Sequence, residues 1–298
     1  MTNIDFEYEI EITMSLIKRS LVVSSILVLA SCSQSVSLLS EIEPENQPVA
    51  TANLNPAADV DYDSYAELLS EYVSDRGLVN YSELQSNRQS LDKFNNSIAS
   101  VTPATFLSWS EDEQIAFLFN AYNSYTLAAI VNREPLDQSI RDIPQVWRKK
   151  QYQVVGQNKS LDDIEHGTLR KDYDEPRLHA ALVCAAMSCP PLLNEPYRAE
   201  QLNAQLDERV SAWLSDPQRG LKIDRQNNTV AISAIFDWYG KDWISRYGTS
   251  EGFTGNEKQR AVLNFISNYV SPEDAQYLQE GNYRVEYLDY DWSLNAQS

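Results

Sequence analysis

The amino-acid sequence predicts an α+β fold, in which a mostly helical single domain carries a small antiparallel β-sheet. Apolar residues recur at helical spacing along most of the chain after residue 60. Candidate strands are few, short and scattered between these helices, unlike the regular alternation of a doubly wound fold. Apolar residues form 43% of the 298-residue chain, so it can build a sizeable core.

The expected elements follow one another without an internal repeat or a second linker. The strongest helix is predicted over 111–132, where apolar residues form a wide face. Ser160 is placed to cap a helix over 161–170, and a small, apolar helix over 177–188 must end at Pro190-Pro191. Further helices are expected over 62–74, 86–100, 198–215, 234–247 and 257–270, and strands over 152–155, 221–224, 229–232 and 284–290.

The start of the chain resembles an export signal that ends at a cysteine. Lys18 and Arg19 precede a run of ten mostly apolar residues, which is too short to span a bilayer but suits a signal peptide. The run ends in Leu29-Ala30-Ser31-Cys32, which resembles the lipobox of bacterial lipoproteins. A buried apolar helix with an unrelated cysteine would not combine basic residues, a short apolar run and small residues before the cysteine. We therefore expect the Cys32 thiol to carry lipid, and two or three acyl chains make such an anchor stable.

Three segments follow from this interpretation. Residues 1–31 are expected to be the signal peptide, with Met14 as the true start because the preceding residues are acidic. Residues 32–59 are rich in Ser, Glu, Pro, Asn and Ala and predict a flexible tether behind the lipidated cysteine. Residues 60–298 form the single folded domain.

The charge of the chain limits its partners and its route to the membrane. The net charge is −19, which repels nucleic acid and anionic lipid headgroups alike. We therefore expect no nucleic-acid partner, and membrane contact only through the lipid anchor. Ser33 follows the cysteine in place of the aspartate that signals inner-membrane retention. The expected location is the cell envelope, at the outer membrane facing the periplasm of a Gram-negative host.

The residues that could carry chemistry lie in one short window. Only nine glycines are present, and no glycine-rich phosphate loop, nucleophile elbow or zincin pattern occurs, so we expect no cofactor. Both histidines and both cysteines other than Cys32 fall within residues 166–189. These four residues are His166, His179, Cys184 and Cys189.

The stretch from about Trp109 to Trp243 resembles the Domain of Unknown Function 547 family. The matching motifs are long and cover most of the folded part. They are Ala116-Phe117-Leu118-Phe119-Asn120-Ala121-Tyr122-Asn123, Ile164-Glu165-His166-Gly167, His179-Ala180-Ala181-Leu182-Val183-Cys184, Ser188-Cys189-Pro190-Pro191-Leu192, Phe236-Asp237-Trp238-Tyr239 and Asp242-Trp243. The resemblance implies a shared fold and no settled activity.

Three uses of the histidine and cysteine window remain open beside a purely structural one. A thiol enzyme would need a thiolate, a histidine and a polar group that orients the histidine. Its candidates are Cys184 or Cys189, His166 or His179, and Asn120, Asn123 or Glu165. A disulfide would suit an oxidising compartment, and a zinc site would use both histidines and the thiols without a standard zinc spacing. A core role is the fourth possibility, because Cys184 lies among small apolar residues.

Helical geometry favours His166 over His179 as the partner of a cysteine. Residues five apart on a helix lie about 140° apart, so His179 and Cys184 would not face each other. A helix C-terminus would also raise the pKa of the Cys189 thiol. His166 has neighbouring carboxylates, and Gly167 allows backbone to approach. We therefore expect His166, Cys184 and Cys189 to meet in one pocket, with Asn120 or Glu165 at its edge.

Structural roles are preferred for two other groups. Buried amides such as Asn120 and Asn123 more often join backbone segments than take part in catalysis. The stripe Tyr239, Trp243 and Tyr247 is expected to be core. Two function classes follow: an envelope lipoprotein that is a thiol-dependent hydrolase or transferase, or a non-catalytic one that binds a small molecule or peptide through a Tyr/Trp-rich surface.

Overall fold

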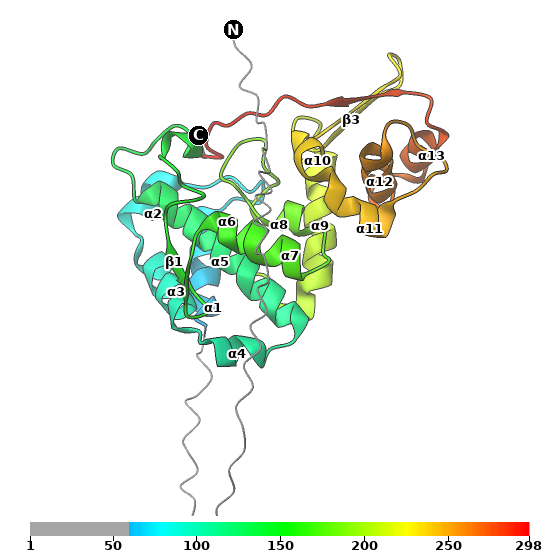
Figure 1. The fold of residues 1–298 in the computed structure, drawn as a ribbon. Coiled ribbons are helices and arrows are strands. Elements are labelled where there is room, and N and C mark those ends of the chain that lie inside the picture. The colour runs from blue at the N-terminus through cyan, green and yellow to red at the C-terminus, as the bar shows by residue number, and fades with distance from the viewer. Residues whose placement is uncertain (1–59, 298) are drawn as a thin grey trace, which may run out of the picture. The chain divides into compact units, whose positions relative to one another are not determined.

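The computed structural model describes residues 60–297, and these form one unit (Figure 1). The predicted signal peptide, Cys32 and the tether lie outside the described residues. Helices dominate, with a two-stranded and a three-stranded sheet, so the α+β prediction is confirmed. Within residues 60–297, no helix combines the length and apolar character needed to cross a bilayer.

Helix α5 (Glu111–Val131) forms the centre of the first half of the unit, residues 60–201. Ser110 begins it with a capping box, in which its side chain and that of Glu113 each bond the other's backbone N–H. Every side chain from Ile115 to Val131 is buried, and the helix contacts α2, α3 and α6. Four shorter helices precede it: α1 (Tyr62–Tyr72), α2 (Tyr81–Ser86), α3 (Gln89–Ser100) and α4 (Pro103–Leu107).

A hairpin and a modified helix follow. Strands β1 (Tyr152–Val154) and β2 (Gln157–Lys159) pair antiparallel, joined by two residues with positive φ, Val155 and Gly156. Ser160 then caps a helix as predicted, but this helix is not uniform. A π-helical turn over Glu165–Leu169 separates α6 (Leu161–Ile164) from α7 (Arg170–Asp172). Such turns widen a helix and often occur at functional sites.

The helix predicted over 177–188 is wrong. Helix α8 (Leu178–Ala181) makes one turn and ends, and Ala185 has a positive φ of 60°. The Val183 N–H bonds the Asn123 side chain and the Met187 N–H bonds the Ser293 carbonyl. These tertiary partners replace the helical ones, because a buried N–H needs one partner and either kind satisfies it.

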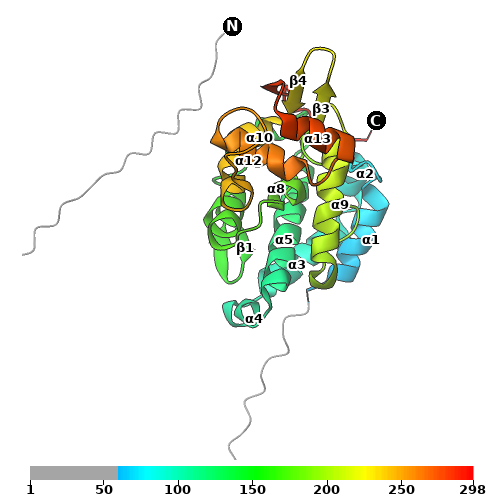
Figure 2. The same ribbon diagram turned by 90° about the vertical axis from the view of Figure 1, so that its right-hand side faces the viewer.

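The second half, residues 202–287, packs around a hydrophobic cluster of its own. Figure 2 shows its helices beside the β3–β4 hairpin. Its helices are α9 (Leu202–Ser215), α10 (Ala234–Tyr239), α11 (Ile244–Tyr247), α12 (Glu257–Ile266) and α13 (Pro272–Glu280), and its strands are β3 (Leu221–Asp224), β4 (Thr229–Ile232) and β5 (Arg284–Tyr287). The β3–β4 hairpin was predicted. Strand β5 pairs parallel with β4, so this sheet is mixed rather than antiparallel.

The C-terminal segment, residues 288–297, returns from the second half to the first (Figure 1). Its first N–H, that of Leu288, bonds the Ile232 carbonyl of β4, and the Gln297 N–H bonds the Val79 carbonyl near α2. Asn295 is buried and accepts a hydrogen bond from the Tyr81 hydroxyl. The segment therefore joins the two halves of the unit.

Two glycines allow a test of this packing. Gly77 has a φ of +71°, and an added Cβ would lie 2.4 Å from the Leu192 nitrogen. Gly167 has an ordinary φ, and an added Cβ would meet nothing closer than Asp163 at 3.8 Å. We expect Gly77→Ala to lower the free energy of unfolding by about 3 kcal/mol. Gly167→Ala should leave it unchanged or raise it by up to about 1 kcal/mol. Urea unfolding measures both, and equal effects would contradict the packing around Gly77.

Candidate functional site

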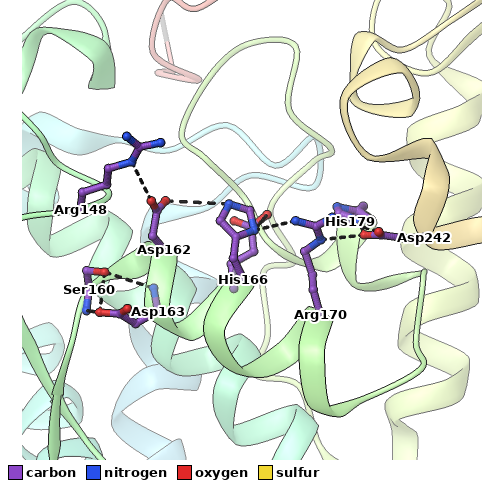
Figure 3. Close-up of polar contacts among 9 residues, drawn as sticks. Arg148, Ser160, Asp162, Asp163, His166, Arg170, His179 and Asp242 are labelled. Atoms are coloured by element: carbon purple, nitrogen blue, oxygen red, sulfur yellow. Dashed lines mark hydrogen bonds and ion pairs between the residues drawn. The ribbon is translucent and has the colours of Figure 1, made fainter. Parts of the chain in front are cut away.

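A row of four charged side chains with one histidine between them lies along one side of the α6–α7 helix (Figure 3). This charged row consists of Arg148, Asp162, His166, Arg170 and Asp242. Asp162, His166 and Arg170 are four residues apart, so they share a face. Arg148 bonds Asp162 from one end at 3.0 Å, and Asp162 Oδ1 lies 3.9 Å from His166 Nε2. Asp242, from the second half of the chain, closes the other end beside Arg170.

Arg170 is the centre of this row. Its guanidinium donates two hydrogen bonds to the Asp242 carboxylate, at 2.7 and 2.9 Å, and lies over the Tyr239 ring at 4.7 Å. A third donor, Nη1, lies 2.9 Å from His166 Nδ1. Arginine has no acceptor, so Nδ1 must be unprotonated. We therefore assign His166 as the neutral tautomer that carries its proton on Nε2, the nitrogen that faces Asp162.

The Asp242 carboxylate also holds His179 in the core. Its Nε2 lies 2.8 Å from Asp242 Oδ2, and its ring stacks on Tyr239 and Trp243. Burial lowers the pKa of His179 despite its bond to Asp242. Burial alone would raise the pKa of Asp242, but the hydrogen bonds from His179 and Arg170 outweigh it and hold that pKa well below its ordinary value.

Glu165 lies in the π turn beside His166 and is buried. Its Oε1 is 3.7 Å from His166 Nδ1. Burial raises the pKa of the Glu165 carboxyl, although His166, Arg170 and the Tyr122 hydroxyl partly oppose the shift. Glu165 therefore holds its proton more strongly than an exposed glutamate. A carboxylate beside His166 was predicted, and Glu165 confirms it. The predicted close approach of backbone at Gly167 is wrong, because the space that an added Cβ would occupy there is open.

Cys184 and Cys189 form a disulfide with their Cα atoms 6.2 Å apart. This was one of the three alternatives open from the sequence. The predicted positions of Cys184 on a helix and of Cys189 at its C-terminus are wrong, because α8 ends at Ala181 and both cysteines lie in the following loop. The hydroxyl of Tyr290 lies 3.1 Å from one sulfur and 3.2 Å from the other. In this state neither sulfur is a free thiol.

The buried amides of α5 join backbone segments. Asn120 donates to the Tyr197 carbonyl and accepts from the Tyr197 N–H, both at 2.9 Å. Asn123 bonds the Ala181 carbonyl and the Val183 N–H in the same way. Each amide thus has a backbone partner on both of its polar atoms, as the structural interpretation predicts. These bonds place the start of the cysteine loop against α5.

Tyr290 contacts the disulfide and lies within electrostatic range of Glu165. Burial raises the pKa of its hydroxyl, and Tyr239 and Glu165 add smaller contributions of the same sign. The Tyr290 hydroxyl therefore contacts both sulfurs and is influenced by the charge of Glu165, while Asn120 bonds the Tyr197 backbone. Trp238, with 47% of its surface exposed, packs on Tyr290 at 4.8 Å and stacks on Trp292 at 5.8 Å. These three rings, Trp238, Tyr290 and Trp292, form the aromatic cluster.

Residues 106–214 match the family model described as protein of unknown function, DUF547. Over this stretch the chain is similar to the DUF547 family. No curated protein and no solved structure matches the chain. The DUF547 stretch contains both histidines and the disulfide, whereas Asp242 and the aromatic cluster lie beyond it.

Several residues of the site were not selected from the sequence. Arg170 stands four residues after His166 and eight after Asp162, a spacing that could have indicated the shared face. Asp242 lies in a motif of the DUF547 resemblance but carried no assigned role, and Tyr239 was predicted only as part of a core stripe, of which Trp243 is buried and Tyr239 and Tyr247 are partly buried. Tyr290 had no local signal, because it reaches the disulfide across 101 positions in the chain.

Other kinds of site find less support. In residues 60–297, no group of three or more His, Cys, Asp or Glu side chains is placed to hold a metal ion. A hollow of about 300 Å³ lies on the β3–β4–β5 sheet, away from the charged row. Its lining residues are Lys222, Asp224, Asn227, Thr229, Ala231, Arg284 and Glu286.

The pairing of Asp242 has a consequence for stability. Its folded pKa is below its unfolded value, so its stabilising effect is present at neutral pH and is lost as the pH falls below about 4. We expect Asp242→Asn to lower the free energy of unfolding at pH 7 by about 2 kcal/mol, since Arg170 loses its partner while partly exposed. The variant should also lose less stability than the wild type on acidification.

Chemical unfolding between pH 3 and pH 7 measures this effect. Asp174→Asn is the matched control, because Asp174 is exposed and pairs only on the surface with Arg246 and Ser245. It should change stability by less than about 0.5 kcal/mol. An equally small effect of Asp242→Asn would contradict the central role of the Arg170–Asp242 pair.

Proposed function

We propose that the chain is an exported lipoprotein, anchored through Cys32 in the cell envelope and acting by binding rather than as a thiol-dependent hydrolase or transferase. The expected site is the outer membrane, with the DUF547 domain facing the periplasm. One observation carries the proposal: Cys184 and Cys189 are paired.

The pairing supports export. Disulfides persist in oxidising compartments and are rare where cellular thiols keep proteins reduced. The chain has three cysteines, and the pairing of two leaves Cys32 as the odd one. An odd cysteine in an exported protein needs its own explanation. Lipidation gives one, because Cys32 ends a run of apolar and small residues behind two basic ones.

The pairing also favours binding over thiol hydrolysis. A cysteine hydrolase needs a thiolate beside an available imidazole. Both sulfurs are in one covalent bond, and the buried His179 is bonded to Asp242. The aromatic cluster instead presents Trp238 to solvent beside a row of donors and acceptors. Exposed aromatic side chains next to polar groups are typical of small-molecule and peptide sites.

The anchor can be tested by metabolic labelling. Cys32→Ser should leave a precursor that no longer incorporates labelled palmitate, because the acceptor thiol is lost. The double variant Cys184→Ser/Cys189→Ser is the control and should still be labelled through Cys32. Palmitate incorporation that persists in Cys32→Ser would rule out this anchor.

The absence of a reactive thiol is tested by alkylation. Iodoacetamide should modify neither Cys184 nor Cys189 in the native or denatured oxidised protein, and both after reduction. Peptide mass mapping reads out each position. Rapid alkylation of either cysteine in native, unreduced protein would instead favour the thiol hydrolase or transferase.

A further inference from the structure

We infer that the Cys184–Cys189 disulfide is a site of thiol–disulfide exchange, in which an incoming dithiol attacks Cys184 and Cys189 leaves. This activity goes beyond ligand binding by the proposed lipoprotein. It rests on three features of the disulfide: unequal exposure, unequal hydrogen bonding, and a loop that is held in place by other bonds.

The two sulfurs differ in access. Cys189 has 2% of its surface exposed and belongs to the hydrophobic core. Cys184 is only partly buried at the edge of that core. Exchange requires a thiolate to reach one sulfur directly. Access therefore selects Cys184 as the sulfur that is attacked.

The hydrogen bonds select the same direction. Cys189 Sγ accepts from the Cys184 backbone N–H, with 3.0 Å between nitrogen and sulfur, and the Tyr290 hydroxyl lies 3.2 Å from Cys189 Sγ and 3.1 Å from Cys184 Sγ. The backbone donor bonds only this sulfur. The backbone N–H stabilises negative charge on Cys189 as the S–S bond breaks, and the Tyr290 hydroxyl can turn its single proton to the same sulfur. A better-stabilised thiolate leaves faster. The buried sulfur thus has the environment of a leaving group.

The loop between the cysteines does not depend on the disulfide for its position. The C-terminal segment bonds it through Asn295 N–H to the Ala185 carbonyl and through the Ser293 carbonyl to Met187 N–H. The Ser188 N–H and the Asp291 carbonyl add another bond. None of these bonds involves sulfur. The two thiols should therefore stay close after reduction, so that an incoming disulfide can oxidise them by the reverse exchange and become a dithiol itself.

The exchange balances in two steps. The first thiolate of the dithiol forms a bond to Cys184 Sγ, and the Cys184–Cys189 bond breaks with its electron pair on Cys189. The second thiolate of the reductant then attacks the reductant's own sulfur in the mixed disulfide, and Cys184 leaves. Two electrons pass to the protein disulfide, both cysteines can take up a proton, and the dithiol becomes a disulfide.

Reduction kinetics of the full-length oxidised chain test the role of Tyr290. With dithiothreitol as the dithiol, Tyr290→Phe should slow the reduction about three- to tenfold, because one donor to the leaving sulfur is lost. Tyr277→Phe is the matched control, since the buried Tyr277 hydroxyl has no hydrogen-bond partner among residues 60–297. It should be reduced at the wild-type rate. An unchanged or faster rate in a folded Tyr290→Phe variant would overturn the inference.

A second measurement uses the wild-type chain and does not depend on any variant folding. Oxidised protein is treated with glutathione, quenched in acid, and alkylated in denaturant. Fragmentation of the peptide that holds both cysteines should place glutathione on Cys184 and the alkyl group on Cys189. Glutathione on Cys189, equal amounts on both, or no mixed disulfide under conditions that reduce an exposed disulfide would overturn the inference.

Discussion

A helix that is buried on every side must satisfy its polar side chains without water, and this constraint on α5 positions much of the site. Asn120 and Asn123 lie in the core, where an unpaired amide would cost about 1–3 kcal/mol. Each is satisfied by the backbone of a distant segment, and Asn123 bonds Ala181 and Val183. Helix α8 therefore ends at this point, and the cysteine loop begins against α5.

The Arg170–Asp242 pair is the second connection, because it joins the two halves of the unit. The partners are 72 positions apart, and two parallel N–H to carboxylate bonds fix their orientation. Asp242 also bonds His179, so one carboxylate orients a guanidinium and an imidazole from different elements. A DUF547 stretch that ended at residue 214 would hold both histidines but lack this partner.

The predictable features are those that depend on local sequence. The helix α5, the cap at Ser160 and the β3–β4 hairpin each have a signal within a few residues, and each was predicted, although α5 is buried on every side rather than on one apolar face. The run after Leu178 has small apolar residues that suit a helix, but Asn123 and the C-terminal segment supply its hydrogen-bond partners instead. The parallel partner of β4 and the contact of Tyr290 with the disulfide join residues far apart in sequence, so local patterns could not reveal them.

The charged row differs in exposure and in ion pairing from one end to the other, and the proposed ligand would meet fewer competing contacts at the exposed end. At one end, Arg170, Asp242 and His179 satisfy one another in a partly buried setting, so a ligand would have to break several charged hydrogen bonds. At the other end, 69% of the Arg148 side chain is exposed, and surface ion pairs of this kind contribute less than about 1 kcal/mol. A ligand would therefore replace the Arg148–Asp162 ion pair at a lower cost in free energy than the pairs at the other end.

The aromatic side chains adjoin this weaker end. Trp147, the neighbour of Arg148 in sequence, packs edge-on against Trp292 of the aromatic cluster at 6.2 Å. His166 Nε2 faces Asp162 at 3.9 Å, a separation that leaves its hydrogen-bonding capacity incompletely used. A ligand that places an acceptor near Nε2 and an apolar face on the rings would gain both contacts while disturbing only the Arg148–Asp162 pair. Binding at this end is therefore compatible with the fixed charges that hold the two halves together.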